Sequence, residues 1–277
     1  MRREILGGRP GGYSSPRRGT SLEFADYRKY SPGDDLRYLD WGIFARSDRL
    51  YVKLFKEEVD LFVYLFVDAS GSMAFPSARE KFTPACELAL ALAYVVLANQ
   101  DHVKLHFLEG NPTTPASPFY RGRHRIMDCA DYFASREPSG LLDFAHTLGD
   151  HLKRIRRPGK AIVVSDFMMP TESYQRGLNL LRACNLDVFA IQVLSPEEMD
   201  PPFPRGRLAL VDKESETEWS LDWSSATREL YRDRLAGHNR QFRSFCHQGG
   251  MPTSLYKTDQ PPGEFVLRAL PSMGLFK

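Results

Sequence analysis

One acidic residue and two serines stand at alternate positions in the run Asp68-Ala69-Ser70-Gly71-Ser72. Spacing by two lets the side chains of one loop converge on a single point, and Gly71 lets the backbone bend there. A carboxylate and two hydroxyls are hard oxygen ligands, which suit Mg²⁺ or Mn²⁺ and not Zn²⁺. The run therefore predicts a divalent metal site that needs at least one more oxygen ligand from elsewhere in the chain.

Asp166 is the candidate for that further ligand. Ser165-Asp166 follows the apolar run 161–164 just as Asp68 follows the apolar run 61–67. Open α/β sheets place their ligand sites outside the carboxyl ends of their strands. We therefore expect the two strand ends, and with them Asp68 and Asp166, to lie side by side.

Alternating strand and helix patterns must position these residues. Residues 59–67 are nearly all apolar, which is typical of a strand buried on both faces, and helical spacing follows over 79–99. Two helix starts are open, a capping box at Ser77–Glu80 and an N-cap at Thr83 before Pro84. The alternation predicts a doubly wound α/β fold with a mainly parallel sheet, because parallel strands need helical crossovers. The further strands are expected at 103–108, 161–165, 188–194 and 254–256, the further helices at 125–135, 142–156, 174–185 and 225–247, and a small hairpin at 208–211 and 218–221.

Two segments precede the main domain, which we place at residues 59–277. Residues 1–20 are rich in glycine, proline and arginine, and they predict a flexible basic arm because such a composition buries little apolar surface. Residues 21–58 are dense in charge and aromatics, with a turn signal at 31–34 and a strand-like alternation over 50–56. We expect this segment to be a β-containing N-terminal extension packed on the main domain.

The extension also carries a group of charged residues beside an aromatic pair. The simplest interpretation is a turn with Asx capping, followed by a network of ion pairs that docks the extension onto the main domain. Trp41 and Phe44 would bury apolar surface in that contact, and a surface for a partner protein is the alternative. The residues concerned are Asp34, Asp35, Arg37, Asp40, Trp41 and Arg46.

Composition excludes several classes of function. The 37 basic and 35 acidic residues nearly cancel, so no overall field favours nucleic acid. The four cysteines lie far apart, which indicates neither a zinc site nor a disulfide framework and favours a reducing compartment. The longest apolar runs, 61–67 and 88–98, fall short of the roughly 20 residues of a membrane span. With no apolar segment of a secretory signal near Met1, we expect a cytoplasmic protein without a membrane span.

The metal-site run and the residues upstream of it resemble known families. Asp68-x-Ser70-x-Ser72 with Asp166 resembles the metal-ion-dependent adhesion site (MIDAS) of von Willebrand factor A domains. The upstream residues resemble the signature of a bacterial domain-of-unknown-function family, number fifty-eight in its series, whose members are often encoded beside MoxR-type AAA+ ATPases. The resemblance covers roughly residues 10 to 270. The signature residues are Glu23-Phe24, Tyr30-Ser31-Pro32-Gly33-Asp34-Asp35, Arg37, Asp40-Trp41 and Ala45-Arg46.

The resemblance implies a role for each site residue. It makes Ser70 and Ser72 direct metal ligands, with Asp68 and Asp166 binding the metal directly or through water. Related sites take a further threonine from the loop at residues 138–143, where this chain has Leu141, so that Ser139 or water would fill the position. An open coordination position then awaits an Asp or Glu of a partner protein, and a MoxR-type AAA+ ATPase is the partner that the family implies.

Two other functions stay open. A metal-dependent phosphohydrolase would use Asp68 as the nucleophile, but such chemistry needs a second acid or a lysine nearby, and Ser70 stands where aspartyl phosphatases place their second aspartate. A structural scaffold with an empty metal site is the other possibility. The sequence favours a non-enzymatic binding module that depends on Mg²⁺ or Mn²⁺.

Overall fold

The computed structural model describes residues 23–56, 60–75, 81–110, 115–211 and 218–272. The chain divides into two compact units, Met1–Leu61 and Phe62–Lys277. The arm predicted at residues 1–20 and the capping box considered at Ser77–Glu80 lie outside the described residues.

The first unit is built on a two-stranded antiparallel sheet. β1 (Glu23–Lys29) pairs with β2 (Tyr51–Lys56), with a register shift between Phe24 and Asp26. A short 3₁₀ helix, η1 (Leu36–Tyr38), and a helix, α1 (Trp41–Ser47), connect the two strands. The strand over 50–56 is confirmed, whereas β1 and α1 were not predicted.

The second unit contains a six-stranded sheet in the order β10-β7-β6-β3-β4-β5. All neighbouring strands are parallel except β5, which pairs antiparallel with β4 at one edge. The predicted doubly wound α/β fold with a mainly parallel sheet is therefore confirmed. The strands are β3 (Phe62–Asp68), β4 (His102–Leu108), β5 (Tyr120–Arg121), β6 (Gly159–Ser165), β7 (Leu186–Leu194) and β10 (Thr253–Lys257).

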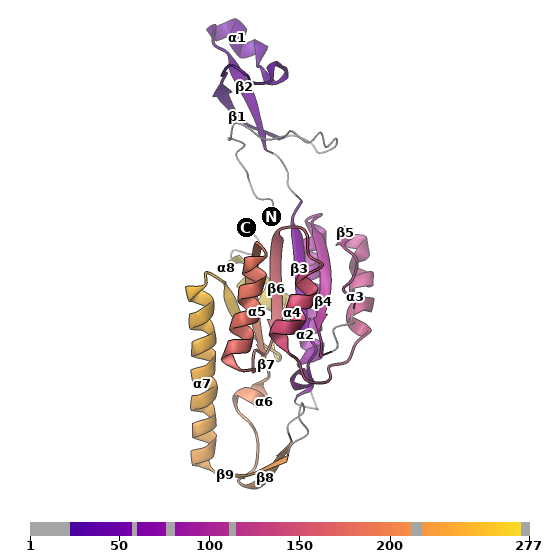
Figure 1. Cartoon of the computed structure of the whole chain (residues 1–277), viewed down its shortest axis with the longest axis vertical. Coiled ribbons are helices and arrows are strands. Elements are labelled where there is room, and N and C mark those ends of the chain that lie inside the picture. Colours follow the sequence, from indigo (N-terminus) through magenta and orange to yellow (C-terminus); the bar gives the residue numbers. More distant parts are fainter. Residues whose placement is uncertain (1–22, 57–59, 76–80, 111–114, 212–217, 273–277) are drawn as a thin grey trace. The chain divides into compact units, whose positions relative to one another are not determined.

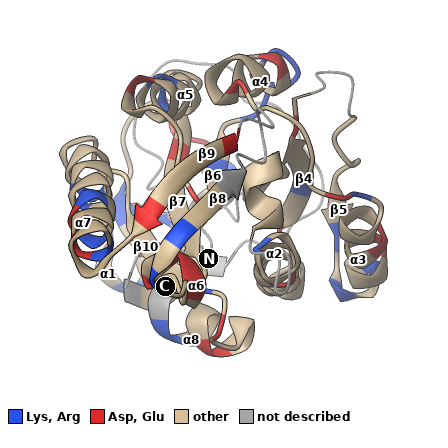
Figure 2. Ribbon diagram, turned by 90° about the horizontal axis from the view of Figure 1, so that it is seen from below, with Lys and Arg blue, Asp and Glu red and all other residues tan. Residues whose placement is uncertain are grey.

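Helices cover both faces of this sheet (Figures 1 and 2). α2 (Phe82–Ala98), α3 (Ile126–Ala134) and α8 (Pro262–Ser272) lie on one side. α4 (Phe144–Leu152), α5 (Thr171–Ala183) and α7 (Ser225–Gln248) lie on the other. The remaining elements are η2 (Gly71–Ala74), η3 (Arg123–Arg125), α6 (Pro196–Met199) and the hairpin of β8 (Gly206–Val211) and β9 (Glu218–Trp223).

β3 is the central strand, and its sequence explains its place. Residues 63–67 are all apolar and at most 1% exposed, because they pack on helices at both faces. Tyr64 and Phe66 face the cluster that contains Phe144 and Leu148 of α4. The strand thus holds its carboxyl end, which carries Asp68, in a fixed position inside the protein. Within the described residues, no helix combines the length and apolarity that crossing a bilayer would need.

The start of α2 differs from the N-cap predicted at Thr83, which is the one of the two expected helix starts that lies among the described residues. The helix begins at Phe82, so Thr83 lies inside the first turn and is not the N-cap. Lys81 occupies the N-cap position and makes no side-chain capping bond to the helix. A lysine is an unusual residue there, because the positive end of the helix dipole disfavours a cation.

Candidate metal centre

The carboxyl ends of β3 and β6 meet at the site. The two strands are parallel neighbours with Val67 paired to Val164, so the residues that follow them emerge together. The hydroxyl of Ser165 donates a hydrogen bond of 2.5 Å to Asp68 Oδ2. Asp68 and Ser165 are fully buried. Because β3 and β6 are neighbours in the sheet, their carboxyl ends lie side by side, as the sequence predicted.

The serine loop after β3 turns its hydroxyls toward one another. The backbone N–H of Ser70 donates to Asp68 Oδ1 at 2.9 Å, which closes an Asx turn. The Oγ atoms of Ser70 and Ser72 are 2.9 Å apart. Ser70 is 2% exposed, and Ser72 is partly exposed at the start of η2. The two hydroxyls and the Asp68 carboxylate therefore belong to one compact polar loop.

Asp166 sits in a strained turn after β6. Its Oδ1 accepts the N–H of Met168 at 3.0 Å, and it is 2% exposed. The residue between them, Phe167, has a φ of 52°, a left-handed conformation that is costly for a large side chain. Its ring stacks on Phe242 of α7 with 4.4 Å between centroids. Packing of the Phe167 ring thus fixes the turn that presents Asp166.

The loop at residues 138–141 touches the serine loop through its backbone. The N–H of Ser139 donates to the carbonyl of Ala69, and the N–H of Gly71 donates to the carbonyl of Gly140, each at 2.9 Å. The side chain of Ser139 is exposed and does not line the pocket described below, whereas Leu141 is 67% exposed and does line it. Ser139 thus reaches the serine loop through its backbone N–H, and a role of its hydroxyl as a metal ligand stays a prediction.

Two charged residues that were not predicted complete the site. Lys81 Nζ donates to Asp166 Oδ2 and to Glu198 Oε1, each at 2.6 Å. Lys81 is 1% exposed. Glu198 is placed by a capping box at α6, in which Ser195 and Glu198 bond one another's backbone. The sequence Ser195-Pro196-Glu197-Glu198 directly after β7 is the signal that could have located this acid.

Burial leaves negative charge at the site without full compensation. Burial, followed by the nearby charge of Asp166, raises the pKa of Asp68 to about 6. Burial likewise raises the pKa of Glu198. Burial alone would lower the pKa of Lys81, but the charges of Asp166 and Glu198 and their hydrogen bonds outweigh it, so that its pKa is raised. The raised pKa favours the charged form of Lys81. Within the part of the chain that the structure describes, the contacts of the Asp68 carboxylate are the N–H of Ser70 and the hydroxyl of Ser165, and neither is a cation.

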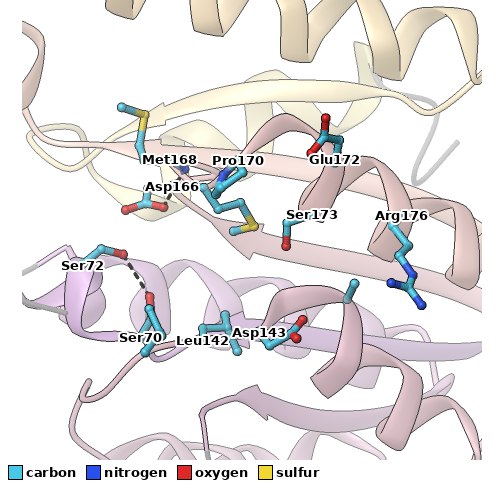
Figure 3. A pocket seen from close by; sticks show the side chains of 13 residues that line it. Ser70, Ser72, Leu142, Asp143, Asp166, Met168, Pro170, Glu172, Ser173 and Arg176 are labelled. Atoms are coloured by element: carbon cyan, nitrogen blue, oxygen red, sulfur yellow. Dashed lines mark hydrogen bonds between the residues drawn. The ribbon is translucent and has the colours of Figure 1, made fainter. Parts of the chain in front are cut away.

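A pocket of about 510 Å³ opens beside the strand ends (Figure 3). Ser70, Ser72 and Asp166 lie at one end of it, and Arg176 of α5 lies at the other. Apolar side chains form much of the wall between them, and Asp143 and Glu172 add acidic groups. The apolar wall residues are Leu141, Leu142, Ala145, Met168, Met169 and Pro170.

The residues present fit a small hard cation. Two buried carboxylates and two hydroxyls supply only oxygen atoms, which are the ligands that such a cation prefers. Among the described residues, no three His, Cys, Asp or Glu side chains form a group that could hold a metal.

Comparison with known proteins shows the family. The family described as "Protein of unknown function DUF58" matches residues 26–241. The chain belongs to this DUF58 family. Uncharacterized proteins of Mycobacterium tuberculosis and Mycobacterium bovis are each 29% identical over 248 residues, which cover 87% of this chain and 76% of theirs. Among solved structures, the conserved hypothetical protein BatB of Bacteroides thetaiotaomicron is 11% identical with a TM-score of 0.46, covering 78% of this chain and all of BatB.

The charged residues of the DUF58 signature make hydrogen bonds and ion pairs inside the first unit. Asp34 accepts hydrogen bonds from Arg28 and from the N–H of Ser31, each at 2.8 Å. Asp35 pairs with Arg37 at 2.6 Å. These contacts make the segment a set of capped turns.

The other signature residues surround α1. Asp40 caps the helix through the N–H of Ile43 at 2.9 Å and accepts the hydroxyl of Tyr27 at 3.0 Å. Arg46 Nε donates to the carbonyl of Gly42 at 3.1 Å. Trp41 is 62% exposed and contacts Phe44 edge-on. Docking of this segment onto the main domain stays a prediction.

Proposed function

We propose that this DUF58 chain is a non-enzymatic binding module that holds Mg²⁺ or Mn²⁺ at the ends of β3 and β6. The ion would be held by Ser70 and Ser72, with Asp68 and Asp166 as the acidic ligands. An open coordination position would then accept an Asp or Glu of a partner protein. The observation that supports this most directly is the meeting of Asp68 with Ser165 at 2.5 Å, which joins the two strand ends beside an open pocket.

The wall of the pocket supports a protein partner. An ion bound to Ser70 and Ser72 would lie at one end of a mostly apolar cleft. A partner segment could place its carboxylate on the ion and an apolar side chain against Met168 and Met169. Methionine suits such a surface, because its flexible thioether adapts to irregular partners.

Metal titration tests the proposal. We expect the wild-type chain to bind Mn²⁺. The Asp68→Ala variant should bind it with an affinity at least about tenfold lower, because the variant removes the buried carboxylate whose charge the ion would neutralise. Isothermal calorimetry measures both affinities. Glu172→Gln is the matched control, since Glu172 lines the same pocket but is exposed and away from the strand ends. Equal binding by wild type and Asp68→Ala would refute the metal site.

A MoxR-type AAA+ ATPase is the partner that the family resemblance favours. We expect such an ATPase from the same organism to co-precipitate with the purified chain in Mg²⁺ and to be lost on addition of a chelator. The Asp68→Ala variant should fail to co-precipitate the ATPase both in Mg²⁺ and in chelator, because the contact is made through the ion. Retention that is equal in Mg²⁺ and in chelator would instead support a structural scaffold.

A further inference from the structure

We propose that Lys81 determines the ligand specificity of this site: its fixed positive charge offsets the surrounding carboxylates, so that a bound divalent cation still attracts an acidic group of a partner. The inference rests on the proposed metal-dependent function and goes further, because it assigns the choice of an anionic ligand to a residue that does not bind the metal. Lys81 acts through Asp166 and Glu198, and is therefore a positioning residue.

The place of Lys81 is unfavourable for stability alone. It is 1% exposed, and burying an ion pair costs desolvation energy that the pair's attraction does not reliably recover. It also stands at the N-cap of the 17-residue helix α2, where the helix dipole repels a cation. A cation kept at such a position points to a functional role.

Its contacts show which charges it offsets. The ammonium lies 2.6 Å from Asp166 and 2.6 Å from Glu198. Their side chains are 2% and 13% exposed, so water screens these charges weakly. Asp166 Oδ2 and Glu198 Oε1 converge on one nitrogen, which ties β6, α6 and the start of α2 together. Lys81 is thus part of the site and not a surface pair.

The charge balance gives the functional consequence. Three acids are well buried near the two strand ends, Asp68, Asp166 and Glu198, and the charge of Lys81 leaves these three carboxylates two net negative charges. The other charged residues of the pocket, Asp143, Glu172 and Arg176, are exposed, so water screens their charges. One divalent cation neutralises that charge, so an incoming carboxylate meets a site without net repulsion. If Lys81 were neutral, the occupied site would keep one negative charge and would repel a carboxylate. Lys81 therefore weakens cation binding somewhat and permits anion binding.

Two single variants change this charge in opposite directions. Lys81→Met keeps an unbranched side chain that is one atom shorter, and it makes the site more negative because it removes the ammonium. Glu198→Gln keeps Lys81 paired to Asp166 and makes the site less negative. In each variant, affinity is measured for Mn²⁺ alone and then for acetate as a carboxylate probe, read from the water-proton relaxation of bound Mn²⁺.

We expect Lys81→Met to bind Mn²⁺ about tenfold more tightly than wild type and to lose the acetate response. Glu198→Gln should bind Mn²⁺ more weakly by a similar factor and should bind acetate more tightly. Damage to the fold would weaken the binding of Mn²⁺ and of acetate together. Changes of opposite sign in these two affinities therefore identify the effect of charge. Glu198→Gln also carries the test by itself if Lys81→Met does not fold, as judged by circular dichroism.

Two results would overturn the inference separately from the metal site. Unchanged Mn²⁺ and acetate affinities in folded Lys81→Met, or in Glu198→Gln, would make Lys81 a structural residue only. Parallel losses of both affinities would lead to the same conclusion. Failure of the metal-dependent function itself would show differently, as wild type that binds no Mn²⁺ or an Asp68→Ala variant that binds it equally.

Discussion

Asp68→Asn is expected to raise the stability of the metal-free protein at pH 7.5 by about 2 kcal/mol, although it removes a proposed metal ligand. Asp68 is fully buried, and burial raises its pKa to about 6. Its ionised form is therefore costly in the folded state at neutral pH. An asparagine can keep both contacts, accepting from the N–H of Ser70 and donating to Ser165 Oγ, without the charge.

The pH dependence follows from the direction of the shift. A carboxyl whose folded pKa lies above its unfolded value favours folding fully below the unfolded value of 3.8, and that contribution is lost as the pH rises through about 6. The stability gain of Asp68→Asn over wild type should thus be largest above pH 6 and should vanish near pH 4. Thermal melts of both proteins at a series of pH values measure this difference.

Metal should reduce the stability advantage of Asp68→Asn. Mn²⁺ stabilises the tighter binder more, so wild type should gain more melting temperature than Asp68→Asn at the same Mn²⁺ concentration. Glu172→Gln should follow wild type in both conditions, because Glu172 is exposed. A metal-free Asp68→Asn variant that is less stable than wild type at pH 7.5 would show that the Asp68 charge is compensated in solution.

Asp166→Asn is expected to have the opposite effect and to lower stability by about 3 kcal/mol. Asp166 holds the ammonium of Lys81 at 2.6 Å, and both side chains are almost fully buried. Removing the Asp166 carboxylate leaves the buried ammonium of Lys81 with one of its two acidic partners, Glu198. Urea unfolding of the metal-free protein measures the loss.

The contrast between the two aspartates is the sharpest check of the site's electrostatics. Asp68 and Asp166 lie at the ends of neighbouring strands and are both almost fully buried. Among the described residues, an ammonium partner is found for Asp166 and not for Asp68. If Asp166→Asn proved as stable as wild type, the ion pair with Lys81 would not exist in solution.

Sequence patterns predicted the sheet and its two acidic strand ends for a clear physical reason. The run Val63–Val67 is apolar on both faces, as a central parallel strand must be, and Asp68 directly follows that run. Asp166 follows the second such run. The order of the strands was not available from these patterns, since β3 and β6 are neighbours although β4 and β5 lie between them along the chain.

Other parts of the molecule gave no comparable signal. Lys81 and Glu198 are 117 positions apart, and no local pattern links a lysine before one helix to an acid after a distant strand. β1 carries charged residues and an irregular register, so it lacks the alternation that reveals a half-buried strand. α8 begins with Pro262-Gly263, which conceals a helix start because proline there also marks a turn.

The left-handed conformation of Phe167, directly after Asp166, couples the packing of the hydrophobic core to the position of the Asp166 carboxylate. Phe167 can leave that conformation only by withdrawing its ring from between Phe242, Phe144 and Tyr174. The direction in which the second acidic group points is therefore set by how these rings fit together. Substitutions among the rings should therefore change how tightly the proposed site binds an ion, although they leave Asp68, Ser70, Ser72 and Asp166 in place.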